Sequence, residues 1–449
     1  MSHVIIRGIP FATRLRAAQG GAKELLQRDR ARAQKFLAGH SHHGPVPFVD
    51  AHRRRHGHHH HHHKETTPTD PTTTAPSTTP PAGTGGSSTG SASTIDVTDS
   101  GVTYTMQVGV GNPATQYTLL IDTGSSNTWV GASAPYNPTS TSSDTGNTVN
   151  VSYGSGTMSG EEYTDTVTLG SNLVIENQSI GVASSAQGFE GVDGILGVGP
   201  VDLTQGTVSN TPEVPTVTDN LYAQGTISSD SIGIFYEPSS TANVTNGEIT
   251  FGVTDNTKYT GEINFVSLTT TSPASNYWGI NQSVSYGTGN TILQTTAGIV
   301  DTGTTLLLLA TEAFQAYQEA TGATQDQTTG LLTITQQQYN NLKSLYFNIG
   351  GVTYEFTPNA QIWPRALNST LGGDEGQIYL IVSDLGSSFG TGLDFISTSQ
   401  NILLSSGAYK RYLSTLDGFG WLQRFYTVFD TANTQLGVAT TAYTDAETN

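Results

Sequence analysis

The chain contains no cysteine, so disulfide bonds give no evidence about the compartment in which the protein works. Histidine is missing from most of the chain as well, because all 12 histidines lie at or before His63. The long remainder therefore lacks the side chains needed for Ser-His or Cys-His nucleophilic catalysis and for a His-ligated zinc site. If this part of the chain is a hydrolase, carboxyl groups must supply its acid and base.

Charged residues and long apolar runs are also scarce. Only 12% of the 449 residues are charged, and no apolar stretch reaches the roughly 18 residues that indicate a membrane-spanning helix. Short apolar runs such as residues 117–121 recur between Gly, Asn and Asp, which is typical of short strands joined by tight turns. The length exceeds that of one ordinary core. We therefore expect a mostly β protein with two lobes and additional segments.

The few charges are distributed unevenly. Residues 1–64 hold 12 of the 18 Lys and Arg and three acids, a local net charge of +9. Residues 95–449, the body, hold six Lys and Arg and 31 Asp and Glu, a local net charge of −25. Such an acidic body does not favour nucleic acid, and it gains little positive charge as its carboxyls protonate in acid. The basic head is instead a predicted partner of the body.

Composition separates this head from the body. Residues 65–94 are dominated by Thr, Pro, Ser and Gly and are predicted to be a linker. The histidine run at residues 58–63 fits an engineered tag, a natural metal-binding tract or a basic linker. Residues 21–38 are rich in helix formers and place several apolar side chains on one stripe, namely Leu25, Leu26, Phe36 and Leu37. This segment is either a prosegment helix that docks on the body or a solvated basic helix.

Two features bear on where the protein works. Residues 1–20 lack the apolar core of a secretory signal peptide, because Arg7 interrupts the short run that precedes it. Five Asn-x-Ser/Thr sequons nevertheless favour a secretory route, at Asn150, Asn177, Asn243, Asn281 and Asn368. We expect an extracellular protein, with the vacuole as a less favoured location.

The body contains an internal repeat. Residues 120–126 and residues 299–305 both have two apolar residues, then Asp-Thr-Gly, then two hydroxyl residues, and the copies lie 179 positions apart. That spacing predicts two similar lobes, residues 95–255 and 256–449, each of which contributes one aspartate. The two aspartates are Asp122 and Asp301.

Each copy of the repeat is predicted to be a buried strand that runs into a tight loop. Gly124 and Gly303 allow the two loops to approach closely, and the hydroxyls of Ser125 and Thr304 can hydrogen-bond the carboxylates. Two adjacent carboxyl groups do not both ionise easily, so they share a proton. The ionised partner can then take a proton from water, and the protonated partner can polarise a carbonyl.

Further motifs extend this pattern along the chain, at residues 153–156, 194–197, 251–252, 259–261, 277–278 and 426–430. With them, roughly residues 101–440 resemble the pepsin family of aspartic endopeptidases, and within it the cysteine-free secreted fungal branch typified by polyporopepsin. The resemblance implies a bilobal pepsin-like fold with the active-site cleft between two related β lobes. It also implies that the protein is made as a zymogen, which its own prosegment inhibits. The active enzyme is then expected to cut polypeptide substrates as a monomer, without a metal or an organic cofactor.

The resemblance assigns roles to individual residues. Asp122 and Asp301 match the catalytic pair, supported by Ser125, Thr304, Gly124 and Gly303. The tip of the flap that closes over substrate corresponds to Tyr153, Gly154 and Ser155, with Trp129 as the indole partner of the tyrosine. Substrate-binding positions match Leu120, Val192, Ile195 and Thr305, with Phe189 nearby. Lys35 is a candidate for a prosegment cation that reaches the catalytic pair.

One segment departs from the family pattern. The family usually has an apolar-apolar-Gly turn behind its second active-site loop, whereas this chain has Leu416-Asp417-Gly418.

Two other function classes are alternatives to a peptidase. A catalytically silent, peptide-binding relative would usually lack one of the aspartates, and both are present here. A secreted all-β adhesin or glycan-binding protein fits the composition but gives the Asp-Thr-Gly repeat no role. An isolated Asp-Thr-Gly is more often a turn, and the repeat reverses that expectation.

Overall fold

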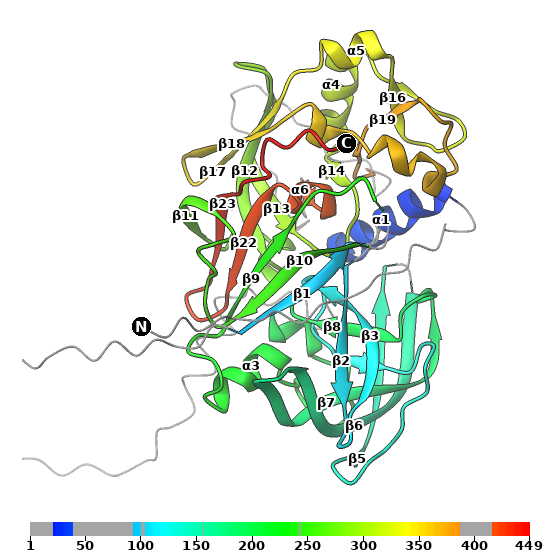
Figure 1. Ribbon diagram of the computed structural model, residues 1–449, viewed down its shortest axis with the longest axis vertical. Helices are drawn as coiled ribbons and strands as arrows, with labels where there is room; N and C mark the ends of the chain where they lie inside the picture. Colours follow the sequence, from blue (N-terminus) through cyan, green and yellow to red (C-terminus); the bar gives the residue numbers. More distant parts are fainter. Residues whose placement is uncertain (1–20, 39–92, 100–103, 155, 242–243, 387–414) are drawn as a thin grey trace, which may run out of the picture.

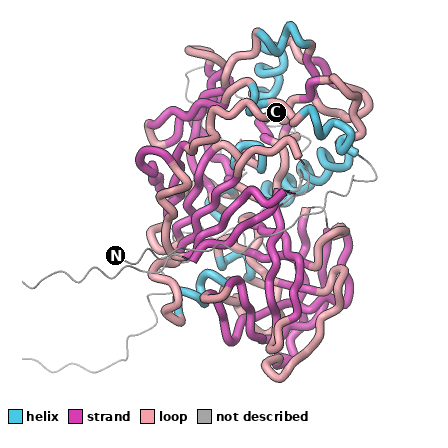
Figure 2. Tube along the Cα trace, viewed as in Figure 1, coloured by secondary structure: helices cyan, strands magenta, loops and turns pink. Residues whose placement is uncertain are grey.

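The computed structural model describes residues 21–38, 93–99, 104–154, 156–241, 244–386 and 415–449. This part of the chain is built mainly from strands, with short helices around them (Figure 2). The strands form sheets of 13, seven and three members. The mostly β architecture expected from the sequence is confirmed.

The 13-stranded sheet has the order β11-β23-β22-β9-β10-β1-β2-β3-β8-β4-β7-β6-β5. Its members are β1 (Ser93–Asp99), β2 (Tyr104–Val110), β3 (Thr115–Asp122), β4 (Trp129–Val130), β5 (Ser143–Tyr153), β6 (Gly156–Gly170), β7 (Leu173–Gln187), β8 (Gly194–Gly197), β9 (Ser231–Tyr236), β10 (Val244–Phe251), β11 (Thr260–Ser267), β22 (Phe425–Asp430) and β23 (Gln435–Thr440).

The seven-stranded sheet has the order β18-β17-β12-β13-β21-β14-β20. It contains β12 (Gly279–Tyr286), β13 (Thr291–Val300), β14 (Leu307–Leu309), β17 (Leu345–Ile349), β18 (Val352–Phe356), β20 (Val382–Asp384) and β21 (Thr415–Asp417). The small sheet contains β15 (Thr324–Gln325), β16 (Leu332–Ile334) and β19 (Ile378–Tyr379). The α-helices are α1 (Gly21–Ala38), α3 (Val217–Ala223), α4 (Thr311–Thr321), α5 (Gln336–Asn340) and α6 (Phe419–Leu422).

The internal repeat of the sequence corresponds to a repeated strand arrangement. In the first half, β3 runs parallel to β8, and β8 is antiparallel to β4. In the second half, β13 runs parallel to β21, and β21 is antiparallel to β14. β3 ends at Asp122, and β13 ends one residue before Asp301, so each aspartate leaves a buried strand at the same point of its motif.

The two halves also share a sheet. Strands β22 and β23, near the end of the chain, pair with each other, and β22 pairs with β9 of the first half. β1 pairs with β10 on one side and β2 on the other, and Figure 1 shows this group of strands running between the upper and lower parts of the molecule. β1 begins at Ser93, so residues 93 and 94, predicted to be linker, belong to a strand. The division at residues 255 and 256 stays a prediction from the repeat.

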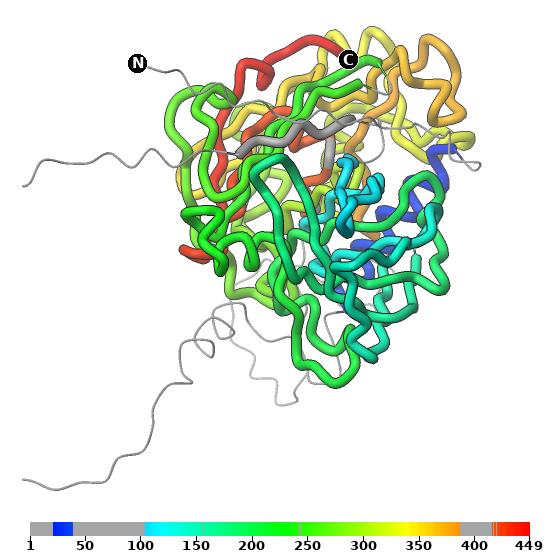
Figure 3. Tube along the Cα trace, turned by 60° about the horizontal axis from the view of Figure 1, so that its bottom comes forward, coloured from blue at the N-terminus to red at the C-terminus, as the bar shows by residue number. Residues whose placement is uncertain are grey.

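Helix α1 spans residues 21–38, as the helix-forming composition predicted, and it packs against the body. Leu25, Leu26 and Phe36 are buried, and Leu37 packs against the same core. Figures 1 and 3 place α1 between the strands of the first half and those of the second. In the part of the chain that the structure describes, no helix is both long enough and apolar enough to span a membrane.

The fold separates the sequons into accessible and inaccessible ones. Asn150, Asn177 and Asn281 are exposed, and Asn243 lies outside the described residues. Asn368 is only 1% exposed, and its Nδ2 donates to the carbonyls of Asp374 (3.0 Å) and Gln377 (2.9 Å). A glycan on Asn368 would remove one of these protons and could not be accommodated in the folded chain.

We therefore predict that the folded protein, produced in a secretory host, carries no glycan at Asn368. Peptide mapping before and after enzymatic deglycosylation should find Asn368 unmodified, while Asn150, Asn177 and Asn281 are open to modification. Folded, active protein with a glycan on Asn368 would contradict the buried placement of this side chain.

Candidate active site

The two predicted aspartates lie together in the interior, each with the same hydrogen-bond donors. Both are 0% exposed. The hydroxyls of Ser125 and Thr304 donate to Oδ2 of Asp122 and Asp301, each at 2.5 Å. The backbone N–H groups two residues beyond each aspartate donate to the Oδ1 atoms, at 2.9 Å in the first loop and 3.2 Å in the second. Hydrogen bonds of this kind favour the ionised form of a carboxyl group.

The glycines of the repeat are needed because the loops approach closely. A Cβ atom on Gly124 would overlap the guanidinium of Arg32 and an oxygen of Asp301. A Cβ atom on Gly303 would overlap the same guanidinium and an oxygen of Asp122. Each glycine therefore leaves room for the carboxyl group of the opposite lobe, as the sequence predicted.

A pair of threonines that the sequence analysis did not single out joins the two loops. The N–H of Thr123 donates to Thr302 Oγ1, and the N–H of Thr302 donates to Thr123 Oγ1, both at 3.0 Å. Thr302 Oγ1 also donates to the carbonyl of Ile121 at 2.9 Å. Both threonines are buried. These reciprocal bonds fix the two aspartates relative to each other. The Thr present in both copies of Asp-Thr-Gly is the sequence feature from which this pair could have been predicted.

A cation from helix α1 bridges the two carboxylates. Arg32 Nη2 donates to Oδ1 of Asp122 and, at 2.8 Å, to Oδ1 of Asp301, while Arg32 Nε donates to Asp301 Oδ2 at 2.6 Å. Burial lowers the pKa of Arg32, but the two carboxylates outweigh it and hold this pKa above its ordinary value. Burial likewise raises the pKa of Asp301, but Arg32 and the loop donors leave it below its usual range.

The structure thereby corrects the candidate for this cation, because Lys35 does not bind the pair. Lys35 Nζ lies 5.1 Å from the ring centroid of Tyr153. Its pKa is lowered to about 8, chiefly by burial and then by the charge of Arg32. In a helix, residues three apart face the same side, so sequence alone did not distinguish Lys35 from Arg32.

Asp29, on the same helix, accepts two backbone hydrogen bonds from the second loop. Its Oδ2 accepts from the N–H groups of Thr305 (3.0 Å) and Leu306 (2.8 Å). Arg28 Nη2 donates to Thr305 Oγ1 at 3.0 Å. Thr305, predicted to bind substrate, is therefore held by the helix. Burial raises the pKa of Asp29 to about 6, against the opposing influence of Arg28 and the two N–H groups.

Residues predicted to form the flap lie at the end of the β5–β6 hairpin. Along β5, Val149, Val151 and Tyr153 are buried and alternate with exposed residues, as expected for a strand with one covered face. Trp129 Nε1 donates to the hydroxyl of Tyr153 at 2.7 Å. A Cβ on Gly154 would overlap the backbone of Arg32, so the tip of the hairpin lies directly on helix α1. Ser155 lies outside the described residues.

An apolar cluster lies beneath this hairpin. Leu120, Ile195 and Phe189 pack in one cluster with Trp129 and Tyr153. Phe189 contacts both partners edge-on, at centroid distances of 4.9 Å to Trp129 and 5.1 Å to Tyr153. Three of the predicted pocket positions are thus brought together. Val192 is buried, but among the described residues it is not a member of this cluster.

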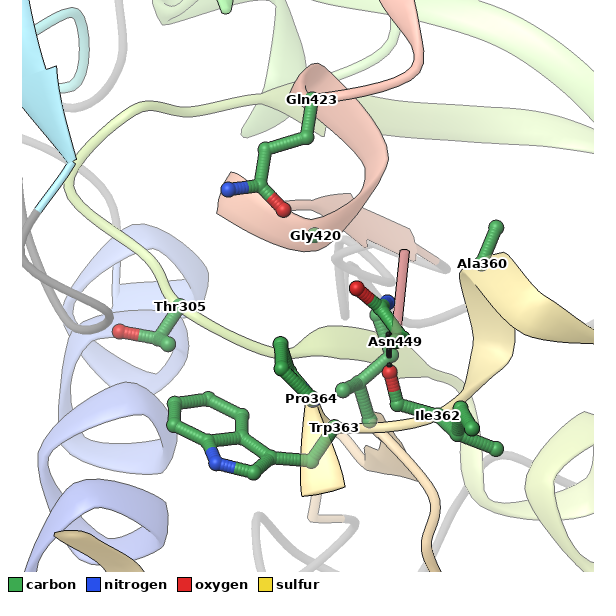
Figure 4. A pocket seen from close by; sticks show the side chains of 9 residues that line it. Thr305, Ala360, Ile362, Trp363, Pro364, Gly420, Gln423 and Asn449 are labelled. Carbon is green, nitrogen blue, oxygen red and sulfur yellow. Dashed lines mark hydrogen bonds between the residues drawn. The ribbon is translucent and has the colours of Figure 1, made fainter. Parts of the chain in front are cut away.

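The unusual Leu416-Asp417-Gly418 segment lies where the family's turn was expected. β21 runs parallel to β13 directly behind the second loop, and the N–H of Asp301 donates to the carbonyl of Asp417 at 3.2 Å. A Cβ on Gly418 would overlap the carbonyl oxygens of Leu306 and Thr304. A small pocket borders the same loop, and its lining includes Thr305, Trp363 and Gly420 (Figure 4).

This chain is similar to known proteins in sequence and in fold. The family model of eukaryotic aspartyl proteases matches residues 103–371. Polyporopepsin from Irpex lacteus is 56% identical over 358 residues, which cover 79% of this chain and 99% of that protein. Pepsin A from Bos taurus is 30% identical, covering 75% of this chain and 83% of its own. The crystal structure of an aspartic proteinase from Irpex lacteus superposes with a TM-score of 0.73 at 55% identity, covering 80% of this chain and 100% of that one.

The threonine pair leads to a prediction about stability. Replacing Thr302 by Val keeps the side-chain shape but leaves the N–H of Thr123 and the carbonyl of Ile121 without their buried partner. We expect the free energy of unfolding to fall by about 1–3 kcal/mol, measured by urea denaturation. Thr302→Ser, which keeps the hydroxyl, should lose less than half of that. Equal losses in both variants would show that the methyl group, not the hydrogen bonds, matters.

Proposed function

The chain belongs to the pepsin family of aspartic proteases and is an aspartic endopeptidase, and on this premise we propose that Asp122 and Asp301 are its catalytic pair. One observation carries the assignment: a single guanidinium nitrogen binds both carboxylates, so the two groups lie within reach of one small polar group. In the active enzyme a water molecule takes that place. The matched donors from Ser125 and Thr304 support the same role for both residues.

The reaction follows from two carboxyl groups that share one proton. The ionised group accepts a proton from water as the water attacks the scissile carbonyl, and the protonated group donates its proton to the carbonyl oxygen. The product of this step is a tetrahedral diol, which collapses as the pair protonates the leaving amine. Neither aspartate forms a covalent bond to the substrate. Because one member must be protonated, the enzyme works at acidic pH.

The substrate is an extended polypeptide that lies between the flap and the loops of the pair. Tyr153 covers it and excludes water, and the hydrogen bond from Trp129 fixes the position of this tyrosine. Leu120, Phe189 and Ile195 form an apolar surface beside the flap, which favours an apolar side chain next to the scissile bond. Main-chain hydrogen bonds to the cleft walls hold the rest of the peptide.

Helix α1 occupies this position in the full chain, which supports its role as an inhibitory prosegment. Arg32 binds both members of the pair, Asp29 accepts from backbone donors of the second loop, and the flap tip rests on the helix backbone. The substrate and the helix therefore compete for the same groups. The basic head and the acidic body add long-range attraction, although exposed pairs are individually weak and are screened by salt.

Acid releases the helix through Asp301 rather than through Asp29. The pKa of Asp301 is held below its ordinary value while Arg32 is bound, so this pairing stabilises docking at higher pH and is lost as pH falls below about 4. The pKa of Asp29 is raised to about 6 in the docked state, so its contribution has the opposite sign: it is present in acid and declines as pH rises through 6. The catalytic pair and the numerous body carboxylates must therefore outweigh Asp29.

The remaining features of the chain fit a secreted enzyme, which we expect to act as a monomer. Three sequons are exposed on the folded surface, including Asn150 on the flap hairpin, whose side chain points away from buried Val149 and Val151. Secretion into an acidic medium fits a body with a net charge of −25, which gains little positive charge there. The vacuole is the less favoured alternative.

The catalytic assignment predicts that Asp122→Asn and Asp301→Asn each abolish hydrolysis and leave the fold intact. An amide neither shares the proton nor acts as a base, so we expect losses of at least about a thousandfold in kcat for protein digestion at pH ~3.5. Asp374→Asn makes the same chemical change at an exposed turn and should keep full activity. Retention of more than about a tenth of the activity by either dyad variant would overturn the assignment.

The inhibitory role of α1 predicts a specific effect of Arg32. In full-length Arg32→Ala the docked helix leaves the pair without a cation, so activity should appear at least about tenfold faster after a shift to pH ~4.5. Arg30→Ala removes the same charge from the helix at a site that binds Asp384 instead, through its carbonyl and, at 4.0 Å, its half-buried carboxylate. Because such a partly exposed pair is weak, this variant should activate within about twofold of the wild type. Activity and fragment mass should be followed together.

Two results would contradict this role. One is equal activation of Arg32→Ala and Arg30→Ala, which would mean that total charge, not contact with the pair, controls release. The other is digestion of substrate by the full chain with the head still attached and α1 still docked. The assignment of Asp122 and Asp301 as catalytic would survive both results.

A further inference from the structure

The two halves differ at one pair of buried positions behind the active-site loops. In the parallel pairing of each half, Ile121 lies opposite Leu196, and Val300 lies opposite Asp417. Because Ile121 and Val300 each precede a catalytic aspartate, Asp417 is the counterpart of Leu196. On the neighbouring strands, the register makes Gln282 of β12 the counterpart of Val108 of β2. The positions held by apolar Val108 and Leu196 in the first half are therefore held by polar Gln282 and Asp417 in the second.

Asp417 and Gln282 form a buried, hydrogen-bonded pair inside the second lobe. Asp417 and Gln282 are both 0% exposed. Gln282 Nε2 donates to Asp417 Oδ2 and to Thr415 Oγ1, both at 2.6 Å. Gly298 of β13 makes room for it, because a Cβ there would overlap Thr415 Oγ1 and Gln282 Nε2.

The cluster contains no compensating charge. Asp417 lies opposite Val300 of β13 and binds Gln282 of β12, while Leu308 and Leu309 of β14 pair with the other residues of β21. None of these groups ionises, and no charged side chain of the described residues acts on the carboxyl. Its Oδ1 has no hydrogen-bond partner among the described residues. Burial raises the pKa of Asp417 to about 7, with only the hydrogen bond from Gln282 opposing it.

The cluster is connected to the catalytic loop through the backbone. The carbonyl of Asp417 accepts from the N–H of Asp301 at 3.2 Å, and the next residue, Gly418, packs against the carbonyls of Thr304 and Leu306. The N–H of Gly420 donates to the carbonyl of Thr305 at 3.4 Å, and Figure 4 shows the loop at Thr305 passing beside helix α6, which carries Gly420. A displacement of Asp417 would therefore displace the loop that holds Asp301.

We propose that Asp417 is a positioning residue for Asp301: its neutral carboxyl group holds the second active-site loop in place, and its ionisation loosens that loop alone. The raised pKa gives the direction of the effect. The stabilisation is fully present below about pH 4 and is lost as pH rises towards and through 7, because no cation among the described residues pairs with the buried ion. The first loop, supported by Leu196, has no such dependence. The proposal rests on the catalytic role proposed for Asp301.

Hydrogen exchange in the full-length chain tests this without relying on catalysis. The exchange of residues 296–306 is compared with that of the matching residues 117–127 at pH 5.5 and pH 8.5, after correction for intrinsic rates. In the wild type, protection of the second loop should fall at least about tenfold more than that of the first. In Asp417→Asn and in the double variant Gln282→Val/Asp417→Leu, which installs the apolar pair of the first half, the loss at residues 296–304 should disappear. Only the N–H groups of Thr305 and Leu306 should keep a pH dependence, because they bind Asp29, whose pKa of about 6 lies in the same range.

A matched control separates this local effect from general stability. Glu162 on β6 is also buried, at 3% exposure, and burial raises its pKa to about 7, but it lies in the other half. Glu162→Gln should leave the exchange of residues 296–306 as in the wild type. After acid activation, Asp417→Asn should keep kcat within about twofold at pH ~3.5, because the wild-type acid is then neutral too.

Three outcomes would overturn the proposal. The first is equal pH dependence of the two loops in the wild type. The second is protection of residues 296–306 by Glu162→Gln to the same extent as by Asp417→Asn. The third is failure of Asp417→Asn to fold at pH 5.5, because a neutral side chain of the same shape should be tolerated if only the charge matters. Failure of the dyad prediction with the expected exchange pattern would instead refute only the catalytic role of Asp301.

Discussion

Two carboxyl groups held side by side out of water are the constraint on which the rest of this structure depends. Asp122 and Asp301 are both fully buried, and each alone would incur a large desolvation penalty as an ion. The loops reduce that penalty with hydroxyl and N–H donors supplied by residues two and three positions further on. The remaining repulsion between the two groups requires one more positive charge, either the guanidinium of Arg32 or a shared proton. The proposed inhibition and the proposed catalysis would each supply this charge in a different way.

The internal duplication solves the geometric part of that problem. Two copies of the same strand and loop bring the aspartates together from opposite sides, and the reciprocal bonds of Thr123 and Thr302 hold the copies in register. Symmetry alone would give the two carboxyl groups equal surroundings. The surroundings differ instead: Asp29 binds only the second loop, the flap belongs only to the first half, and a buried acid lies behind Asp301 where leucine lies behind Asp122. Such differences allow one member of the pair to carry the proton.

The sequence predicted the features that depend on short, repeated motifs. Asp-Thr-Gly at half-body spacing predicted that Asp122 and Asp301 lie together, that Ser125 and Thr304 bind them, and that the body has two lobes. Short apolar runs between turn residues predicted the mostly β fold. Composition predicted helix α1. Features that depend on three-dimensional contacts were not predicted: Lys35 and Arg32 lie on nearly the same helix face, so only the docking angle decides that Arg32 reaches the pair. Likewise, Asp417 read as a poor match in an apolar turn, because its partner Gln282 lies 135 residues away.

The central sheet has a consequence for how the chain acquires its fold. β9 pairs with β10, its near neighbour in sequence, but also with β22, and β11 pairs with β23 near the end of the chain. These contacts close loops of well over a hundred residues, and such non-local pairing is slow because chain entropy is lost before the contacts form. The sheet is therefore completed only after the last strands have left the ribosome. Helix α1, which contacts both halves, is synthesised long before these strands. If this helix is removed as proposed, the remaining chain must keep its fold mainly through a high barrier to unfolding, because a second folding event would start without the segment that contacts both halves.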